Sequence, residues 1–213
     1  MPLVEPGIAS EAGHLILASA SQARRDLLKN AGIAFTVQPA DVDEVAIRQA
    51  LVAAAQGEGV EAGDVAEVLA RAKAEAVSVG HPQAMVIGAD QTLSLDDAIL
   101  SKPLSRAEAR QQLTALKGRT HQLHSGVALA LAGEIVWSYV ETASLTVRAF
   151  SDAFLDDYLN RAGDSVMQSV GAYQVERIGI QLFEAIDGDH FTILGLPLLA
   201  LMDELRARGF LLA

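Results

Sequence analysis

The chain has 213 residues, of which 51% are hydrophobic and 20% charged, and its formal net charge is −11. This composition excludes intrinsic disorder, the net negative charge argues against unspecific binding to nucleic-acid backbones, and the lack of cysteine excludes disulfides and thiolate metal sites. No apolar run approaches the roughly 20 residues that a membrane-spanning helix needs, and the acidic N-terminus is unlike a secretory signal. We therefore expect a cytoplasmic protein, with an N-terminal extension over residues 1–14 and a single domain over residues 15–213.

The first elements of the domain predict a strand, a polar turn and a helix. Residues 15–18 form an apolar run typical of a buried strand, and residues 21–31 show the pattern of a helix. A helix N-terminus has unpaired N–H groups and a dipole that favour phosphate. The turn adds hydroxyl and guanidinium donors to it, namely Ser19, Ser21, Arg24 and Arg25. A capped surface helix with solvated arginines is the alternative.

The remaining elements alternate between the two kinds of secondary structure, which predicts an α/β or α+β fold without a linker between independent domains. The long runs on either side of Ala132 and Gly133 indicate a hairpin whose strands could bend around a cleft. We expect further strands at residues 35–39, 84–89, 93–95, 99–100, 120–131, 134–150, 178–186 and 191–194, and further helices at residues 46–55, 65–79, 106–117, 151–161 and 197–208.

Asp90 is the strongest single catalytic candidate. It follows the apolar strand 84–89 directly, and open α/β sheets bind their ligands at the carboxyl ends of strands. Its carboxylate could hold a divalent cation or act as a general base on water. The alternative is an Asx turn that simply ends the strand.

Other charged residues suit the same chemistry less specifically. Lys102, which precedes Pro103, could bind a phosphate oxygen or be solvated, and Lys73, on an alanine-rich helix, could point into a cleft or into water. Glu176 could accept a hydrogen bond from a base edge or form an ordinary ion pair. The acidic group Asp41, Asp43 and Glu44 offers hard oxygen ligands for Mg²⁺ or Mn²⁺, or is the acidic start of a helix. The five histidines lack a metal-binding spacing, so we expect structural or surface roles for them.

Taken in order, these motifs resemble the Maf family of nucleoside triphosphate pyrophosphatases. LASASQARRDLL (residues 17–28) is similar to the family's LASxSPRRxELL, DVDE (41–44) to its DxDE, and LARAKAEAV (69–77) to its LAxxKAxAV. GADQ (88–91), SKP (101–103) and LKGRTHQLHSGVAL (116–129) follow, and the pattern GAY to GLPL covers residues 171–198. The resemblance spans about residues 15–209, nearly the whole chain.

The resemblance implies a hydrolase that cleaves a nucleoside triphosphate between the α and β phosphates, yielding a nucleoside monophosphate and pyrophosphate. It implies two α/β lobes around a cleft on a bent mixed sheet with flanking helices, a homodimer, and Mg²⁺ or Mn²⁺ as cofactor. Asp90 matches the proton acceptor and Glu44 a carboxylate near metal and water, so both would be catalytic and hold the metal. Residues that would bind the substrate are Ser19, Ser21, Arg24, Arg25, Lys73, Lys102, Gln91 and Glu176.

Departures from the family motifs bear on the base. Ala23 replaces the first arginine of the motif, Gln91 replaces a threonine, QSVG at residues 168–171 lacks the family's lysine, and Glu176 stands where pyrimidine-preferring members carry glutamine. These changes resemble the branch that acts on 7-methyl-GTP, and a carboxylate could accept the N1–H and 2-amino hydrogens of guanine. Arg177 could weaken this by pairing with Glu176.

Three alternatives stay open. The chain could be a dTTP and UTP pyrophosphatase, a house-cleaning enzyme with a permissive base pocket, or a regulatory nucleotide-binding protein of septation with little turnover.

Overall fold

The computed structural model describes residues 13–55 and 59–212, so the expected N-terminal extension lies almost wholly outside the described residues. Seven strands form one sheet in the order β2–β1–β3–β5–β6–β7, with β4 paired to β3. β1 runs parallel to β2 and β3, and the other pairs are antiparallel, which confirms the expected mixed sheet. The strands are β1 (Leu15–Leu17), β2 (Thr36–Val37), β3 (Met85–Leu95), β4 (Ala98–Leu100), β5 (Thr120–Leu131), β6 (Glu134–Val147) and β7 (Phe183–Asp187).

Helices flank this sheet, and hydroxyl residues begin three of them. Side-chain oxygens of Ser21, Ser105 and Ser151 cap α1, α4 and α5 by accepting backbone N–H groups. No helix within the described residues is long and apolar enough to cross a membrane. The helices are α1 (Gln22–Asn30), α2 (Glu44–Ala54), α3 (Ala62–Ser78), α4 (Arg106–Leu116), α5 (Asp152–Ala162), α6 (His190–Ile193) and α7 (Leu198–Ala207), with 3₁₀ segments η1 (Gly163–Met167), η2 (Val170–Ala172) and η3 (Ile178–Leu182).

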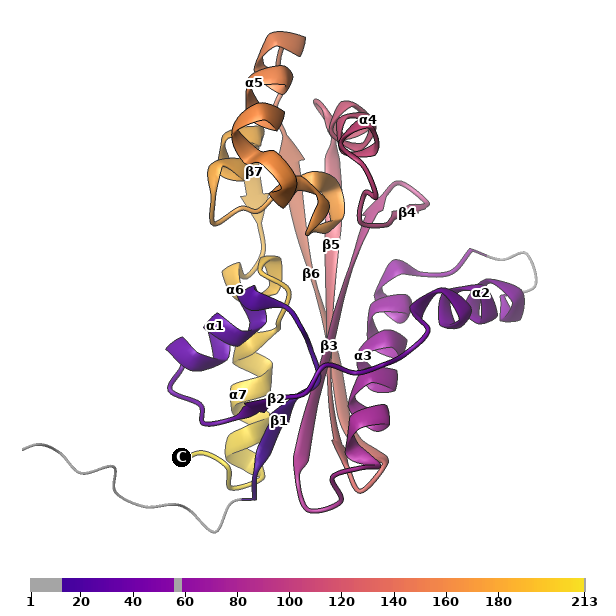
Figure 1. Ribbon diagram of the computed structural model, residues 1–213, viewed down its shortest axis with the longest axis vertical. Helices are drawn as coiled ribbons and strands as arrows, with labels where there is room; N and C mark the ends of the chain where they lie inside the picture. Colours follow the sequence, from indigo (N-terminus) through magenta and orange to yellow (C-terminus); the bar gives the residue numbers. More distant parts are fainter. Residues whose placement is uncertain (1–12, 56–58, 213) are drawn as a thin grey trace, which may run out of the picture.

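The long strands β3, β5 and β6 run through two lobes (Figure 1). In the lower lobe of that view, α1 and α7 pack on one face of the sheet and α3 on the other. Alternation along β1 serves both faces, because Leu15 and Leu17 face α1 and α7 while Ile16 faces α3. In the upper lobe, α4, α5 and the 3₁₀ segments cover the far ends of the same strands.

Helix α3 lies unusually close to the sheet, and glycines make this possible. A Cβ atom on Gly88 of β3 would lie 2.1 Å from the carbonyl oxygen of Ala70. One on Gly126 of β5 would lie 2.6 Å from the carbonyl oxygen of Ala66. Larger residues at these strand positions would push α3 outward, so the glycines determine how closely α3 and its side chains approach β3.

Two expected strands near the C-terminus are wrong. The strand expected at residues 178–186 begins with the 3₁₀ segment η3, and only Phe183–Asp187 is strand. The strand expected at 191–194 is the helix α6, because the Asp189 carboxylate caps it by accepting the N–H groups of Phe191 and Thr192 at 3.0 and 3.1 Å. Short apolar runs do not distinguish a buried strand from a buried helix turn, so the capping residue decided the outcome.

Candidate active site

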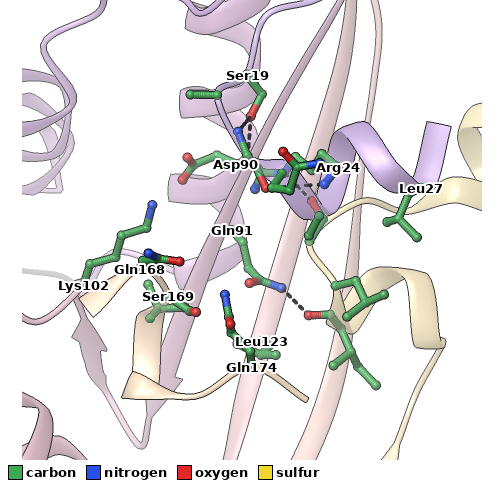
Figure 2. A pocket seen from close by; sticks show the side chains of 18 of the residues that line it. Ser19, Arg24, Leu27, Asp90, Gln91, Lys102, Leu123, Gln168, Ser169 and Gln174 are labelled. Carbon is green, nitrogen blue, oxygen red and sulfur yellow. Dashed lines mark hydrogen bonds between the residues drawn. The ribbon is translucent and has the colours of Figure 1, made fainter. Parts of the chain in front are cut away.

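A cavity of about 1110 Å³ opens between the lobes, large enough for a nucleotide. Although the chain has a net charge of −11, five cations and four acids line this cavity. One group of lining residues is called the charged end: Ser19, Ser21, Arg24, Glu44, Arg48, Lys73, Asp90 and Lys102. A second group is called the turn end: Gln91, Leu123, Gln168, Ser169, Tyr173, Gln174, Glu176 and Arg177. Figure 2 shows Ser19, Arg24 and Asp90 on one side, Gln168, Ser169 and Gln174 on the other, and Gln91 between them.

Asp90 occupies a different place in the sheet from the one expected. Strand β3 does not end before Asp90 but continues to Leu95, because β5 pairs with it as far as Ser94. The parallel partner β1 leaves β3 after Ile87, so Asp90 lies just beyond the point where the sheet loses this neighbour. Its carboxylate therefore faces the cavity from the middle of a rigid strand, where the two lobes meet.

Lys73 joins the two carboxylates of the charged end. Its Nζ atom lies 2.6 Å from Oδ1 of Asp90 and 2.6 Å from Oε1 of Glu44. Burial by itself would raise the pKa of Glu44, but the hydrogen bond and charge of Lys73, with the charges of Arg48 and Lys102, outweigh it and lower this pKa. Oδ2 of Asp90 is buried and accepts no hydrogen bond among the described residues.

The acidic group Asp41, Asp43 and Glu44 is divided by the start of α2. Oδ1 of Asp43 accepts the N–H of Ala46 at 2.9 Å and thereby begins the helix at Glu44, two residues before the expected start. Asp41 is exposed, and neither Asp41 nor Asp43 lines the cavity. Of these three acids only Glu44 reaches the site, because the carboxylate of Asp43 caps α2 instead.

Arg24 is buried at the floor of the cavity. Its Nε donates to the carbonyl of Gly195 at 2.7 Å, and Nη1 donates to the carbonyl of Ala89 and the hydroxyl of Ser19 at 2.9 and 3.1 Å. Burial lowers its pKa, against the charges of Asp90 and Glu44. Arg24 thus ties α1 to β3 and to the C-terminal segment, while Ser21 lines the cavity and caps the helix.

Arg25 is the one expected substrate-binding residue that the structure does not bring to the cavity. Its Nη2 donates instead to Oε1 of Gln22 on the same helix, at 2.7 Å. Consecutive helical residues point about 100° apart, so Arg24 and Arg25 cannot both face the floor. By contrast, Lys102 enters from the loop after β4, and burial together with the charge of Arg24 lowers its pKa.

At the turn end, Gln91 presents an acceptor to the cavity. Its Nε2 donates to the Ser125 hydroxyl at 3.0 Å and lies 3.1 Å from the carbonyls of both Thr192 and Ile193 (Figure 2). These acceptors occupy the amide hydrogens, so Oε1 is the atom left for a ligand. Glu176 and Arg177 are exposed, and no ion pair joins them within the described part of the chain.

Side chains hold the turn end in an irregular backbone conformation. Gly171 and Ala172 have φ values of 77° and 62°, of which the second is unusual for a residue with a Cβ. The Tyr158 hydroxyl donates to the carbonyl of Ala172 at 3.1 Å, and the Tyr173 hydroxyl lies 2.6 Å from Nε2 of His121. Burial lowers the pKa of His121 to about 4, so the ring is neutral near pH 7.

The charged end offers a donor set that fits a divalent cation only together with a ligand. Among the residues that the structure describes, no three His, Asp or Glu side chains are grouped to hold a metal. Glu44 and Asp90 do converge on Lys73, and Oδ2 of Asp90 is a further, buried oxygen that accepts no hydrogen bond among the described residues. Mg²⁺ is commonly held by one or two carboxylates, with substrate phosphates and waters completing the shell.

Arg48 is a residue of the site that the sequence analysis missed. It lines the cavity, and its Nη2 lies 3.7 Å from Oδ2 of Asp90. The signal was its spacing of four from Glu44, which places both on one face of a helix. Because we expected that helix to begin only at Ala46, Glu44 stood outside it and the pairing was not visible.

Comparisons with known proteins find relatives over nearly the whole chain. Residues 14–208 match the family model described as Maf-like protein. The chain is 52% identical over 194 residues to the nucleoside triphosphate pyrophosphatase of Paramagnetospirillum magneticum, covering 91% of this chain and 98% of that one. It is 53% identical over 192 residues to the 7-methyl-GTP pyrophosphatase of Brucella suis, covering 90% and 94%. Over 199 residues it is 49% identical to the nucleoside triphosphate pyrophosphatase of Rhodospirillum rubrum, covering 93% and 96%.

Proposed function

The chain belongs to the Maf family, and we propose that it is a nucleoside triphosphate pyrophosphatase that releases pyrophosphate by cleaving the α–β phosphate bond. The observation that carries this proposal is the Glu44–Lys73–Asp90 arrangement in a cavity lined by cations. It places a buried carboxylate with an unpaired oxygen among groups that bind phosphate. A carboxylate placed beside phosphate-binding cations suits the activation of water next to a phosphate.

The residues of the charged end have different roles in this reaction. Arg24 and Lys102, with the hydroxyls of Ser19 and Ser21, bind and orient the phosphates. Asp90 takes the proton of a water whose oxygen attacks the α phosphorus, and the bond to the β phosphate breaks as pyrophosphate leaves. When bound at Glu44 and Asp90, Mg²⁺ or Mn²⁺ supplies Lewis-acid polarisation of the phosphate. The cations stabilise the charge that develops on the phosphate oxygens.

For the base, 7-methyl-GTP is the substrate we propose. Two acceptors, Oε1 of Gln91 and the carboxylate of Glu176, line the turn end and suit the N1–H and 2-amino donors of a guanine. Methylation adds positive charge to the purine, which a carboxylate also favours. Relatives named 7-methyl-GTP pyrophosphatase are about as similar to this chain as those with the broader name.

Pyrophosphate release in the presence of Mg²⁺ or Mn²⁺ tests the proposal. The panel is 7-methyl-GTP, GTP, dTTP, UTP, CTP and ATP, and kcat/KM is compared across it. We expect release from 7-methyl-GTP to be the fastest. A preference for dTTP and UTP would contradict the base assignment and keep the enzyme class, equal rates would indicate a house-cleaning enzyme, and tight binding without release would favour a regulatory protein.

The organisation of the molecule completes the proposal. Residues 15–213 form one domain, since β3, β5 and β6 run through both lobes. The chain works as a homodimer in the cytoplasm, where nucleoside triphosphates are made and used. Supporting a dimer, β7 pairs only with Ser144–Val147 of β6, and the rest of that edge carries the stacked rings of Trp137 and Tyr139. Light scattering on the purified protein measures the state, and a monomer would contradict it.

A further inference from the structure

The cations of the charged end differ in how fully the protein already uses them. Arg24 donates three hydrogen bonds to protein oxygens, and Lys73 lies 2.6 Å from each of two carboxylates. Arg48 makes neither kind of contact: within the described residues its one ion-pair partner is Asp90, at 3.7 Å, while Glu44, whose pKa its charge helps to lower, lies beyond ion-pair distance. That distance exceeds the range of a hydrogen bond, so the guanidinium donors of Arg48 are still available.

The position of Arg48 relative to Asp90 indicates what these donors would meet. Arg48 approaches Oδ2, the buried oxygen that accepts no hydrogen bond, whereas Lys73 holds Oδ1. A water that gives its proton to Oδ2 lies within hydrogen-bond reach of that atom, and the phosphorus it attacks lies about 3–3.5 Å from the water. A phosphate in this position is within reach of the same guanidinium.

The electrostatics of the site favour this role for Arg48 over Lys73. The charge of Lys73 is shared by two carboxylates at short distance, which leaves it little net attraction for a further anion. Neither carboxylate lies within hydrogen-bond distance of Arg48, since Asp90 is 3.7 Å away and Glu44 is beyond ion-pair distance, and its planar guanidinium can donate two parallel hydrogen bonds to phosphate oxygens. Its side chain is 29% exposed, which leaves it room to turn toward a ligand.

We propose that Arg48 is a further catalytic residue, which binds a non-bridging oxygen of the phosphate under attack. This inference rests on the proposed pyrophosphatase activity. Charge on that oxygen increases as water attacks, so the contact is stronger in the transition state than in the ground state. Arg48 therefore contributes mainly to kcat, and less to the affinity for the nucleotide.

The test compares Arg48→Gln and Arg48→Lys with the wild-type enzyme. The matched control is Arg71→Gln on neighbouring α3, since Arg71 is 49% exposed, pairs with Glu67 at 3.8 Å and does not line the cavity. Helix α2 buries none of its residues, so truncating Arg48 leaves the fold intact, as thermal unfolding will verify. Turnover is measured with 7-methyl-GTP over a range of pH, and ground-state affinity by calorimetry with α,β-methylene-GTP.

We expect Arg48→Gln to lower kcat by about 100- to 1000-fold while the affinity for the analogue changes less than about threefold. Arg48→Lys restores part of the rate, and the acid limb of the pH profile stays in place. A kcat within about threefold of the Arg71→Gln control overturns the inference. So does an acid limb that shifts while the plateau rate is unchanged, because Arg48 would then act only through Asp90. Wild-type protein that releases no pyrophosphate overturns the proposed function as well, which separates the two failures.

Discussion

The two ends of the cavity are built in different ways. Most of the charged end is placed by regular elements: Asp90 lies within β3, Lys73 on α3, and Arg24 in the first turn of α1. Apart from Gln91 on β3 and Leu123 on β5, the turn end is placed by 3₁₀ segments and turns with positive φ values, held by the hydroxyls of Tyr158 and Tyr173. Helices and strands hold their side chains by backbone hydrogen bonds, whereas the turn end depends on a few side-chain contacts.

This difference suggests a division of roles within the molecule. Groups that perform chemistry need fixed distances, which the sheet and its close contact with α3 supply. Groups that select a base can differ between relatives without disturbing the chemistry, because irregular turns tolerate sequence change more readily than a packed sheet. Changes at the charged end should therefore affect rate or overall stability, and changes at the turn end should have more local effects.

The largest effect is expected at the centre of the charged end. Asp90→Asn keeps the shape of the side chain but removes the base, so kcat should fall by about 100- to 10,000-fold. The melting temperature should change little. The control is Asp97→Asn in the exposed turn after β3. If the Asn variant retained turnover, Asp90 would not be the proton acceptor.

The second largest effect is expected at the close contact between β3 and α3, which positions the charged end. In Gly88→Ala the new methyl would lie 2.6 Å from the backbone N of Ala74, so α3 must move away from β3. We expect a loss of about 3 kcal/mol or more in the free energy of unfolding, measured with urea, and a lower kcat because Lys73 moves with α3. Gly80→Ala is the control, as its Cβ meets only Val77 O at 3.7 Å. Equal stabilities of the two variants would contradict this.

At the turn end, the effect should appear as a dependence of stability on pH. Unfolded chains protonate His121 near pH 6.5, whereas burial keeps the folded residue neutral down to about pH 4. The unfolded state therefore binds more protons in this window, and the folded state loses about 3 kcal/mol as the pH falls through it.

His121→Gln removes this titration, so its free energy of unfolding should vary less between pH 6.5 and 4 than that of the wild type. His14→Gln, at an exposed position, should keep the wild-type slope. If the free energy of unfolding depended on pH equally in the wild type and His121→Gln, the buried ring of His121 would not be the cause of that dependence.

The smallest effect is expected at Arg25, which follows Arg24 of the charged end in the sequence. Arg25→Gln should change kcat/KM less than about twofold and stability by less than about 0.5 kcal/mol, because the one hydrogen bond of the Arg25 side chain among the described residues is to Gln22 on its own helix. Arg24→Gln, measured in parallel, should lose most of the activity and stability, since it leaves the carbonyls of Gly195 and Ala89 unpaired. Similar losses in both would contradict the assignment of Arg24 alone to the cavity.

Local pattern was sufficient for much of the fold. The helices expected at residues 106–117 and 151–161 are α4 and α5, and Ala132–Gly133 predicted the hairpin of β5 and β6, because helix periodicity and tight turns depend on neighbouring residues. The order of short motifs pointed to Asp90, Glu44 and Lys73, which the structure brings within 2.6 Å contacts.

Other features could not be predicted from local pattern. The extent of β3 beyond Asp90 depends on β5, about 35 residues further along the chain, which pairs with it. The choice between Arg24 and Arg25 depends on which face of α1 packs on the sheet, and the role of Arg48 depends on where α2 begins. The apolar residues 191–194 are compatible with a strand or a helix, and the cap formed by Asp189 favours the helix.

The sequence by itself determined the family, the α/β character and the chemical types gathered at the cavity, since these follow from residue identity and short-range spacing. Only the tertiary structure decided which atoms meet. It placed Lys73 between two carboxylates, left Oδ2 of Asp90 without a hydrogen bond, and turned the acceptor of Gln91 toward the cavity. Such contacts join residues far apart in the chain, so their distances depend on how whole strands and helices pack.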